Sequence, residues 1–301
     1  MKITASVDWS SLVIAIVGGD EREQEIARLA AGTGAEVRAF GWPFPDEEVP
    51  GLTAYEAAAS AMKGAGYALF PIPGIGADGS LYAPGCPGIV PDAALLEELA
   101  EGAHIILGRS DERLEVAAGA SGVVLHEYEA DTELMLLRAP AIVEGALQTA
   151  IENTDVTIHG ATIAVVGQGN IGSLLTKTLT LLGAQVHAAA RNPVQRAAAF
   201  ASGATPLPLE ELPALAPRLD MLFSTVPAPV VDRRILERLP RGCLVMDLAA
   251  PPGGVDLAGA EELGLRAVWA RGLGRRAPIT VGRSQWMGIK RLIEAIERER
   301  R

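Results

Sequence analysis

Hydrophobic residues come in short bursts of strand length that alternate with stretches of helical spacing along the whole chain. The bursts predict strands at residues 13–17, 36–40, 67–71, 104–107, 123–128, 162–166, 185–190, 221–225, 244–247 and 267–269. Strands that alternate with helices are typical of parallel sheets with helical crossovers. We therefore expect an α/β protein with two Rossmann-like domains and mainly parallel sheets.

Two longer helical patterns suggest how these domains are joined. Residues 132–153 predict one long connecting helix that Pro140 kinks or divides. Residues 284–299 predict a last helix, whose apolar face could pack back on the first domain. The expected parts are a substrate or partner domain (1–135), a dinucleotide-binding domain with the connecting helix (136–283) and a C-terminal helix (284–301).

Composition narrows the class of protein. Aromatic residues make up only 4% of the chain, so Ala, Val, Leu and Ile must fill the cores, as in covered parallel sheets. The net charge of -11 disfavours binding to nucleic acid. We expect neither a signal peptide nor a membrane span, because Gly, Pro or a charge interrupts each apolar run. Cys86 and Cys243 lack metal-ligand or redox spacing, which suits a cytoplasmic protein without a metal site.

A glycine-rich turn is the strongest chemical signal. Gly167, Gly169 and Gly172 form G-x-G-x-x-G directly after TIAVV and directly before a helical pattern. Such glycines allow a tight turn, close approach of a pyrophosphate and close helix packing, and the helix N-terminus faces the phosphates. We expect this turn, with Asn170 and Ile171, to bind a nicotinamide dinucleotide; the alternative is a fold that has lost its ligand.

Arg191 bears on which dinucleotide is bound. It follows the next predicted strand, about where an acidic residue would bind the ribose 2′-hydroxyl of NAD. An arginine there can pair with a 2′-phosphate, which favours NADP over NAD, although an unliganded surface arginine would look the same. We expect Asn192 beside it to contact the cofactor as well.

The loops STVPAP and DLAAPPGGVD end the two following strands at the same edge of the sheet. From them we expect Thr225, Val226, Pro227 and Ala249 to contact the cofactor. Asp247 and Asp256 could orient ligand or loop, or could simply be strand-end and helix-cap carboxylates.

The first domain has its own strand, Gly18-Gly19 turn and helix, but no third glycine, so we expect no second dinucleotide site. Asp20 can cap that helix, and Asp20 and Arg22 can also line a cleft facing the nicotinamide. The Gly- and Pro-rich segment 71–91 is predicted to be a loop.

Taken together, these motifs resemble those of the family formed by the A subunit of dipicolinate synthase. The matching segments, in the family's order, are IVGGDEREQEI, VEGALQTAIENTDVTIHG, VVGQGNIG, STVPAP, DLAAPPGGVD and GLGRRAPITVG. The resemblance implies NAD(P)-dependent oxidation of a dihydrodipicolinate-type dicarboxylate from the lysine pathway to dipicolinate. It also implies that the partner is a flavoprotein-like B subunit, in a homo- or hetero-oligomer, in the mother-cell cytoplasm of a sporulating bacterium.

Forming an aromatic ring removes a hydride and a proton, so the enzyme mainly positions its substrate. Thr280 could donate to a carboxylate, Glu144 or Asp20 could accept the proton, and His159 is expected to be structural. The candidate carboxylate clamps are Arg22, Arg271, Arg275 and Arg276.

Three segments depart from the family's pattern, and they leave two alternatives open. Asn170 and Ile279 stand where the family has arginine and lysine, Arg271 precedes the segment GLGRRAPITVG, and LRAPAI is less polar than usual. One alternative is a related dehydrogenase of another cyclic imine or amino acid. The other is a scaffold or sensing subunit that binds NADP while a partner performs catalysis.

Overall fold

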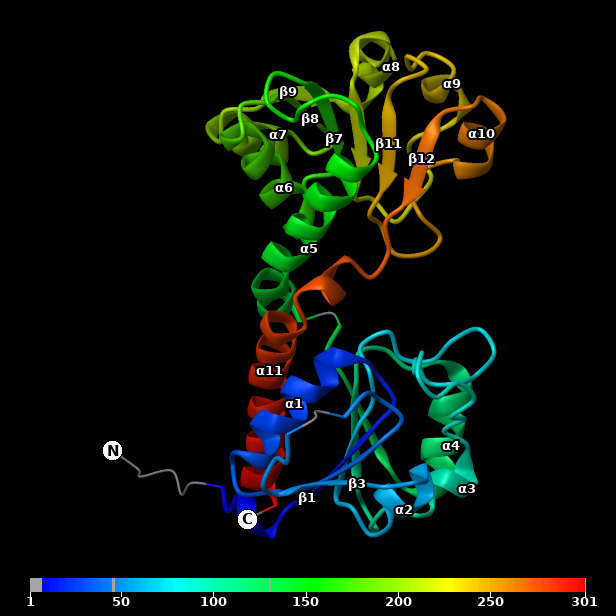
Figure 1. The fold of residues 1–301 in the computed structure, drawn as a ribbon, viewed down its shortest axis with the longest axis vertical. Coiled ribbons are helices and arrows are strands. Elements are labelled where there is room, and N and C mark those ends of the chain that lie inside the picture. Colours follow the sequence, from blue (N-terminus) through cyan, green and yellow to red (C-terminus); the bar gives the residue numbers. More distant parts are fainter. Residues whose placement is uncertain (1–6, 45–46, 130, 301) are drawn as a thin grey trace. The chain divides into compact units, whose positions relative to one another are not determined.

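The computed structural model describes residues 7–44, 47–129 and 131–300, and it divides into two compact units. The first unit comprises Met1–Leu137 and Ala277–Arg301, and the second comprises Arg138–Arg276. Each unit contains a six-stranded parallel sheet covered by helices, which confirms the predicted α/β class with two Rossmann-like domains (Figure 1). The expected border at 283/284 falls inside the last helix, which belongs wholly to the first unit.

The first unit is built on a sheet of strand order β3-β2-β1-β4-β5-β6. Its strands are β1 (Val13–Val17), β2 (Glu36–Phe40), β3 (Leu52–Ala54), β4 (Tyr67–Leu69), β5 (His104–Leu107) and β6 (Val124–Glu127). The prediction missed β3, because this three-residue edge strand is mostly exposed and carries no apolar burst. The order reverses between β1 and β4, so the topological switch point lies there.

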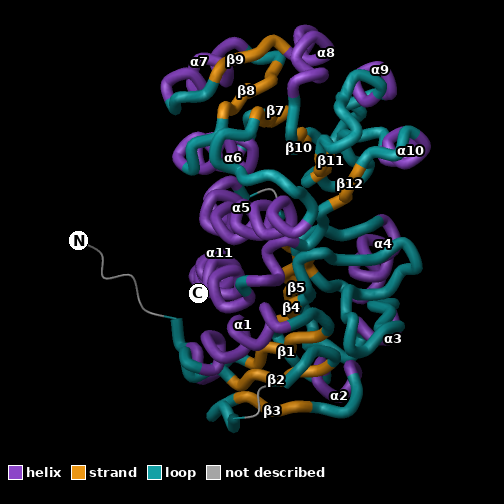
Figure 2. The backbone as a smooth tube through the Cα atoms, turned by 45° about the horizontal axis from the view of Figure 1, so that its top comes forward, coloured by secondary structure: helices purple, strands orange, loops and turns teal. Residues whose placement is uncertain are grey.

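Helices cover both faces of the first sheet (Figure 2). They are α1 (Glu21–Ala31), α2 (Ala58–Met62), α3 (Ala93–Leu96), α4 (Glu112–Ser121) and α11 (Pro278–Glu299). On one side Met62, Leu96 and Leu114 pack on strand residues that include Ala68 and Ile105. On the other side lie α1 and α11, which contact each other along much of their length.

α11 begins at Pro278, six residues before the predicted start at 284. Proline suits the first turn of a helix, because its missing N–H has no partner there in any case. The apolar spacing begins later, since Ile279 is 55% exposed. At Gly282 a Cβ would lie 2.7 Å from the Arg22 carbonyl oxygen, so the first turns of α11 approach α1 too closely for a side chain.

The second unit repeats the plan with strand order β12-β11-β10-β7-β8-β9. Its strands are β7 (Thr162–Val166), β8 (Gln185–Ala190), β9 (Thr205–Pro208), β10 (Met221–Ser224), β11 (Leu244–Asp247) and β12 (Arg266–Trp269). The prediction missed β9, which contains two prolines. Prolines are tolerated there because β9 is an edge strand.

Helices again cover both faces of this sheet. They are α5 (Thr132–Glu152), α6 (Asn170–Leu181), α7 (Pro193–Ala201), α8 (Leu212–Leu215), α9 (Arg233–Leu236) and α10 (Leu257–Glu262). One core layer joins α5, α6 and α7 to side chains such as Val165 and Phe223. The second core layer joins α8, α9 and α10 to strand residues that alternate with the first set, such as Val166 and Leu222.

α5 runs through Pro140 without being divided, and the border between the units lies within it. By length and composition this helix could cross a membrane, although we expected no apolar run of that length. In its most apolar window 44% of the residues are buried, and Val143 and Ala150 belong to the core of the second unit. α5 is therefore a core helix.

Side chains on β4, β5 and β6 form a polar cluster with the end of α11. His104 Nδ1 lies 2.8 Å from His126 Nε2, and the Tyr67 ring stacks on His104 at a centroid distance of 5.6 Å. The Tyr67 hydroxyl donates to Glu297 over 2.6 Å. Burial, together with the positive charge of Arg300, lowers the pKa of His104 to about 4.

This shift predicts that acid weakens the first unit. Unfolded histidine has a pKa near 6.5, so between about pH 6.5 and 4 the unfolded chain binds a proton that folded His104 does not. Stability should fall as pH drops through that window, on the order of 1 kcal/mol after allowance for solvent screening of this partly exposed ring.

An NMR titration of the imidazole C–H signals measures this directly. We expect the His104 signal to report a neutral ring at pH 5, and His104→Gln to reduce the pH dependence of urea unfolding between pH 7 and 4.5. A His104 signal that titrates near pH 6.5 would contradict the interpretation.

Candidate nucleotide-binding site

The glycine turn lies between β7 and α6 in the second unit. The space for a side chain differs among its three glycines and indicates what each glycine is needed for. Gly167 has φ +92°, a backbone conformation that favours glycine. At Gly172 a Cβ would overlap the Gly167 carbonyl oxygen, so the helix can pack this closely only without a side chain. At Gly169 a Cβ would meet no heavy atom within 4 Å, which leaves room for a ligand.

α6 begins at this open side. Gly169 is its N-cap residue, no side chain caps the helix, and its first turn carries no acidic residue. The first amides of a helix lack partners within it, and the helix dipole adds partial positive charge there. Because α6 is 12 residues long and starts at the turn, its N-terminus fits a pyrophosphate.

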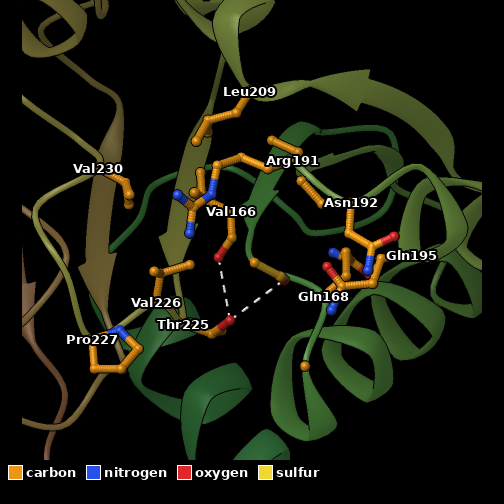
Figure 3. A pocket seen from close by; sticks show the side chains of 14 residues that line it. Val166, Gln168, Arg191, Asn192, Gln195, Leu209, Thr225, Val226, Pro227 and Val230 are labelled. Atoms are coloured by element: carbon orange, nitrogen blue, oxygen red, sulfur yellow. Dashed lines mark hydrogen bonds between the residues drawn. The ribbon is translucent and has the colours of Figure 1, made fainter.

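A cavity of about 310 Å³ opens beside the turn at the carboxyl ends of β7, β8 and β10. Figure 3 shows its lining. Of the predicted cofactor residues, Gly167, Gly169, Arg191, Asn192, Thr225, Val226 and Pro227 line it. The structure thus brings together residues from three segments of the sequence, and it adds Gln195, Leu209 and Val230, which sequence reasoning missed.

The polar wall of this cavity follows the end of β8. The Arg191 side chain is exposed, and its guanidinium has no hydrogen bond or ion pair to any residue the structure describes. Asn192 caps α7 by accepting the Val194 N–H over 2.8 Å. Arg196 donates to the carbonyl oxygens of Ala190 and Arg191, which fixes the backbone that presents Arg191.

Thr225 ties the next strand to the glycine turn. Its hydroxyl lies 3.2 Å from the Val166 carbonyl oxygen and 3.4 Å from that of Gly167, as the dashed lines in Figure 3 show. A Cβ on Gly167 would come within 2.6 Å of the same hydroxyl. Thr225 therefore holds the turn in place, while Val226 and Pro227 line the cavity.

Asp247 organises the loop after β11. Its carboxylate is fully buried, and it accepts N–H groups from Ala249 (3.0 Å), Gly254 (2.7 Å) and Val255 (3.1 Å). Ala249 is itself buried, at 5% exposure. This geometry fits the loop-orienting role considered for Asp247, and its contacts in the structure are all to the chain's own backbone. Asp256 caps α10 through the Gly259 N–H.

Trp269 is the last residue of β12, and Arg271 follows the strand at the same edge. The Trp269 indole N–H donates to the Ala249 carbonyl oxygen over 3.0 Å. The Arg271 guanidinium carbon lies 5.1 Å from the centre of the Trp269 ring. The loop after β11 is thus held by a buried carboxylate on one side and by an indole on the other.

Two further candidates in this unit pair with each other. Glu144 on α5 and Arg276 form an ion pair with a 2.5 Å separation. α5 approaches the chain at Leu273 so closely that a Cβ on Gly145 would lie 2.8 Å from its carbonyl oxygen. Sequence reasoning treated Glu144 and Arg276 as independent groups, and the structure makes them one partly exposed pair.

In the first unit, Asp20 caps α1 and binds Arg22. The Arg22 Nε and Nη2 donate to the two Asp20 carboxylate oxygens over 2.7 and 2.9 Å, and both side chains are buried. Glu23 completes a capping box by accepting the Asp20 N–H over 2.7 Å. Desolvation raises the pKa of this buried Glu23 to about 7.

Glu23 was missed as a candidate, although the D-x-x-E spacing before an apolar run is a known N-terminal signature. A Cβ on Gly19 would collide with the carboxyl group of Glu23, so only glycine at position 19 leaves room for that side chain. Thr280 is exposed in the first turn of α11, and His159 packs against Gly183 in the second unit. No cluster of three or more potential metal ligands occurs among the described residues.

Two family models match the chain, one in each unit. The model of the N-terminal domain of the dipicolinate synthase A subunit matches residues 13–129. The NAD-binding domain of D-isomer specific 2-hydroxyacid dehydrogenases matches residues 138–245, which include the glycine turn and the cavity. Fold and site thus define a two-domain protein with a dehydrogenase-like, NAD-binding second domain.

Whole-chain relatives narrow this class. The dipicolinate synthase A subunit from Bacillus subtilis is 28% identical over 293 residues, which cover 96% of this chain and 98% of the relative. Crystal structures of the Bacillus halodurans and Bacillus subtilis proteins both match with a TM-score of 0.85 at 27% identity, covering 94% and 98% of this chain and 99% of each of theirs. Over nearly its whole length the chain is thus similar to the A subunits of dipicolinate synthase.

The space at Gly169 yields a test that separates binding from folding. Gly169→Val places its side chain where no protein atom lies, in a backbone conformation with φ -80°, so the variant should fold. Because it blocks the approach of the pyrophosphate to the α6 amides, NADPH affinity should fall roughly 100-fold or more in a fluorescence titration.

Gly242→Val is the matched control, because Gly242 is also exposed with open space around it and precedes β11 at the opposite edge of the sheet. We expect it to bind NADPH like the unchanged protein. Undiminished binding by Gly169→Val would remove the nucleotide site from this turn.

Proposed function

We propose that this protein is an oxidoreductase that converts a dihydrodipicolinate-type dicarboxylate to dipicolinate with NADP, or less favourably NAD, as hydride acceptor. The observation that carries the proposal is the similarity, over 96% of the chain, to the A subunit of dipicolinate synthase. It is joined to a dinucleotide site whose glycine spacing, open helix N-terminus and cavity fit the cofactor.

The chemistry asks for positioning more than for acid-base power. Dihydrodipicolinate differs from dipicolinate by two hydrogens, which leave as a hydride and a proton. The nicotinamide, when bound, supplies the hydride acceptor. The chain's own residues would hold the pyrophosphate at Gly167–Gly172, including Asn170 and Ile171, and would keep the loops after β10 and β11 fixed through Thr225 and Asp247.

The remaining catalytic assignments stay predictions. Asp20 could take the proton, although its carboxylate already binds Arg22. Glu144 could do so only if it is released from Arg276. Glu23, with its raised pKa and its place beside Asp20, joins them as a candidate. Thr280 is proposed as a donor to a substrate carboxylate, since its side chain is exposed.

The choice of NADP rests on Arg191. Its guanidinium lines the cavity and carries a positive charge that no acidic group among the described residues neutralises. A 2′-phosphate would supply that partner, and bidentate pairing of arginine with phosphate is a strong interaction. Asn192 and Gln195 lie close enough along the same wall to contribute further donors.

A related dehydrogenase of another cyclic imine or amino acid is the second candidate. Ile279 is 55% exposed at the start of α11, where the family pattern has a lysine. Arg271, two residues after the end of β12, is a second departure from that pattern. These changes favour an altered substrate while they leave the nucleotide site intact. A scaffold protein that binds NADP without turnover is the third candidate.

The proposed partner and cellular location rest on the resemblance to the family alone. We propose that the partner is a flavoprotein-like B subunit, that the assembly is oligomeric, and that the location is the mother-cell cytoplasm of a sporulating bacterium. The relatives from Bacillus support these proposals.

Arg191→Asp tests the choice of cofactor. Replacing the cation by an anion should weaken NADPH on the order of 100-fold through loss of the phosphate contact and added repulsion, and NADH only a few-fold. A fluorescence titration with both cofactors measures this, with Arg241→Asp, at the opposite edge of the sheet, as a matched charge control. Equal losses for NADPH and NADH would remove the 2′-phosphate assignment.

The reaction itself is tested by ultraviolet detection of dipicolinate. The purified protein receives the product of dihydrodipicolinate synthase with NADP or NAD, with and without the B subunit. We expect dipicolinate to form in at least one mixture. Tight NADP binding without any dipicolinate would reject the proposed reaction and favour the second or third candidate.

A further inference from the structure

The four arginines considered as carboxylate clamps occupy different environments. Arg22 is buried in a bidentate pair with Asp20. Arg276 is paired with Glu144, and Arg275 also has an interaction within the described chain. Arg271 differs from them, because its guanidinium has no acidic partner or hydrogen bond among the residues that the structure describes.

Arg271 is nevertheless held in place. Its guanidinium lies over the Trp269 ring, 5.1 Å from the ring centre. Trp269 is itself anchored by its indole N–H to the Ala249 carbonyl oxygen. The backbone is fixed too, since the Ala270 N–H donates to the Asp247 carbonyl oxygen over 2.8 Å and the Arg271 N–H donates to that of Trp269 over 3.0 Å.

The place of Arg271 in the sheet suggests which part of a ligand it would meet. A dinucleotide lies across the carboxyl edge of a Rossmann sheet, with one nucleotide over each half. Arg191, at the end of β8, belongs to the half formed by β7, β8 and β9. Arg271 follows β12, in the half formed by β10, β11 and β12. If the adenosine phosphate meets Arg191, the nicotinamide and the substrate beside it lie over the half that carries Arg271.

We propose that Arg271, supported by Trp269, is the residue that binds a carboxylate of the substrate. The inference rests on the proposed function and names the group that recognises the acid. A guanidinium stacked on a ring keeps its edge N–H groups available, and these match the two oxygens of a carboxylate. The surrounding loop brings no competing anion, because the buried Asp247 carboxylate is already bound by three backbone N–H groups.

Calorimetric binding of pyridine-2,6-dicarboxylate to the full chain, in the presence of saturating NADP, tests the proposal without requiring turnover. Arg271→Gln should weaken dicarboxylate binding roughly 10- to 100-fold, the range expected for a lost charge-assisted contact, and should leave NADP affinity within about twofold. Arg271→Lys should recover only part of the loss, because lysine lacks the planar fork.

Arg241→Gln is the matched control. It removes the same charge from an exposed position before β11, at the opposite edge of the same sheet, and should leave dicarboxylate binding unchanged. Equal affinities in Arg271→Gln and Arg241→Gln, with a wild-type protein that binds the dicarboxylate, would overturn the assignment of Arg271 and leave the proposed function standing. Binding of NADP but of no dicarboxylate by the wild-type protein would overturn both.

Trp269 is proposed as a positioning residue. Trp269→Phe keeps an aromatic face under the guanidinium, whereas Trp269→Leu removes it. We expect Phe to retain most of the dicarboxylate affinity and Leu to lose nearly as much as Arg271→Gln. Retention of full affinity in a folded Trp269→Leu protein would exclude the supporting role.

Discussion

The nucleotide-binding unit depends on the close contact between Gly172 and the Gly167 carbonyl oxygen. Any side chain at Gly172 would overlap that oxygen. The contact brings the first turn of α6 against the end of β7, so the helix amides face the open space in front of Gly169. Without it the helix would stand away from the sheet, and the amides and the cavity would no longer meet.

Buried and partly buried polar groups hold the loops around this contact in place. Thr225 links the end of β10 to the turn, Asp247 gathers three N–H groups of its loop, and Gly254 packs too closely on the Val226 carbonyl oxygen to admit a side chain. A buried carboxylate is costly unless hydrogen bonds compensate it. The carboxylate of Asp247 is compensated by backbone alone, so this charge shapes the loop while leaving the edge of the sheet to residues such as Arg271.

Local pattern predicted most of the fold, and tertiary contacts explain what it missed. Buried central strands such as β7 and β11 carry apolar runs, whereas β3 and β9 are edge strands whose exposed residues and prolines give no such signal. The glycine turn and Arg191 could be found because their spacing alone encodes the geometry. Two contacts could not be found in this way. Glu144 and Arg276 come from different elements, and the stacking of Arg271 on Trp269 depends on side-chain directions that sequence spacing does not specify.

The first unit is discontinuous in sequence, since α11 follows the whole of the second unit yet packs on α1. During synthesis on the ribosome, residues 7–137 therefore emerge with α1 but without α11, the longer of the two helices that cover this face of their sheet. Trp286, Ile289 and Ile293, which fill that face, arrive about 150 residues later than Leu137. The whole of the second unit is therefore synthesised before the helix that completes the first unit, although the first unit begins earlier in the chain.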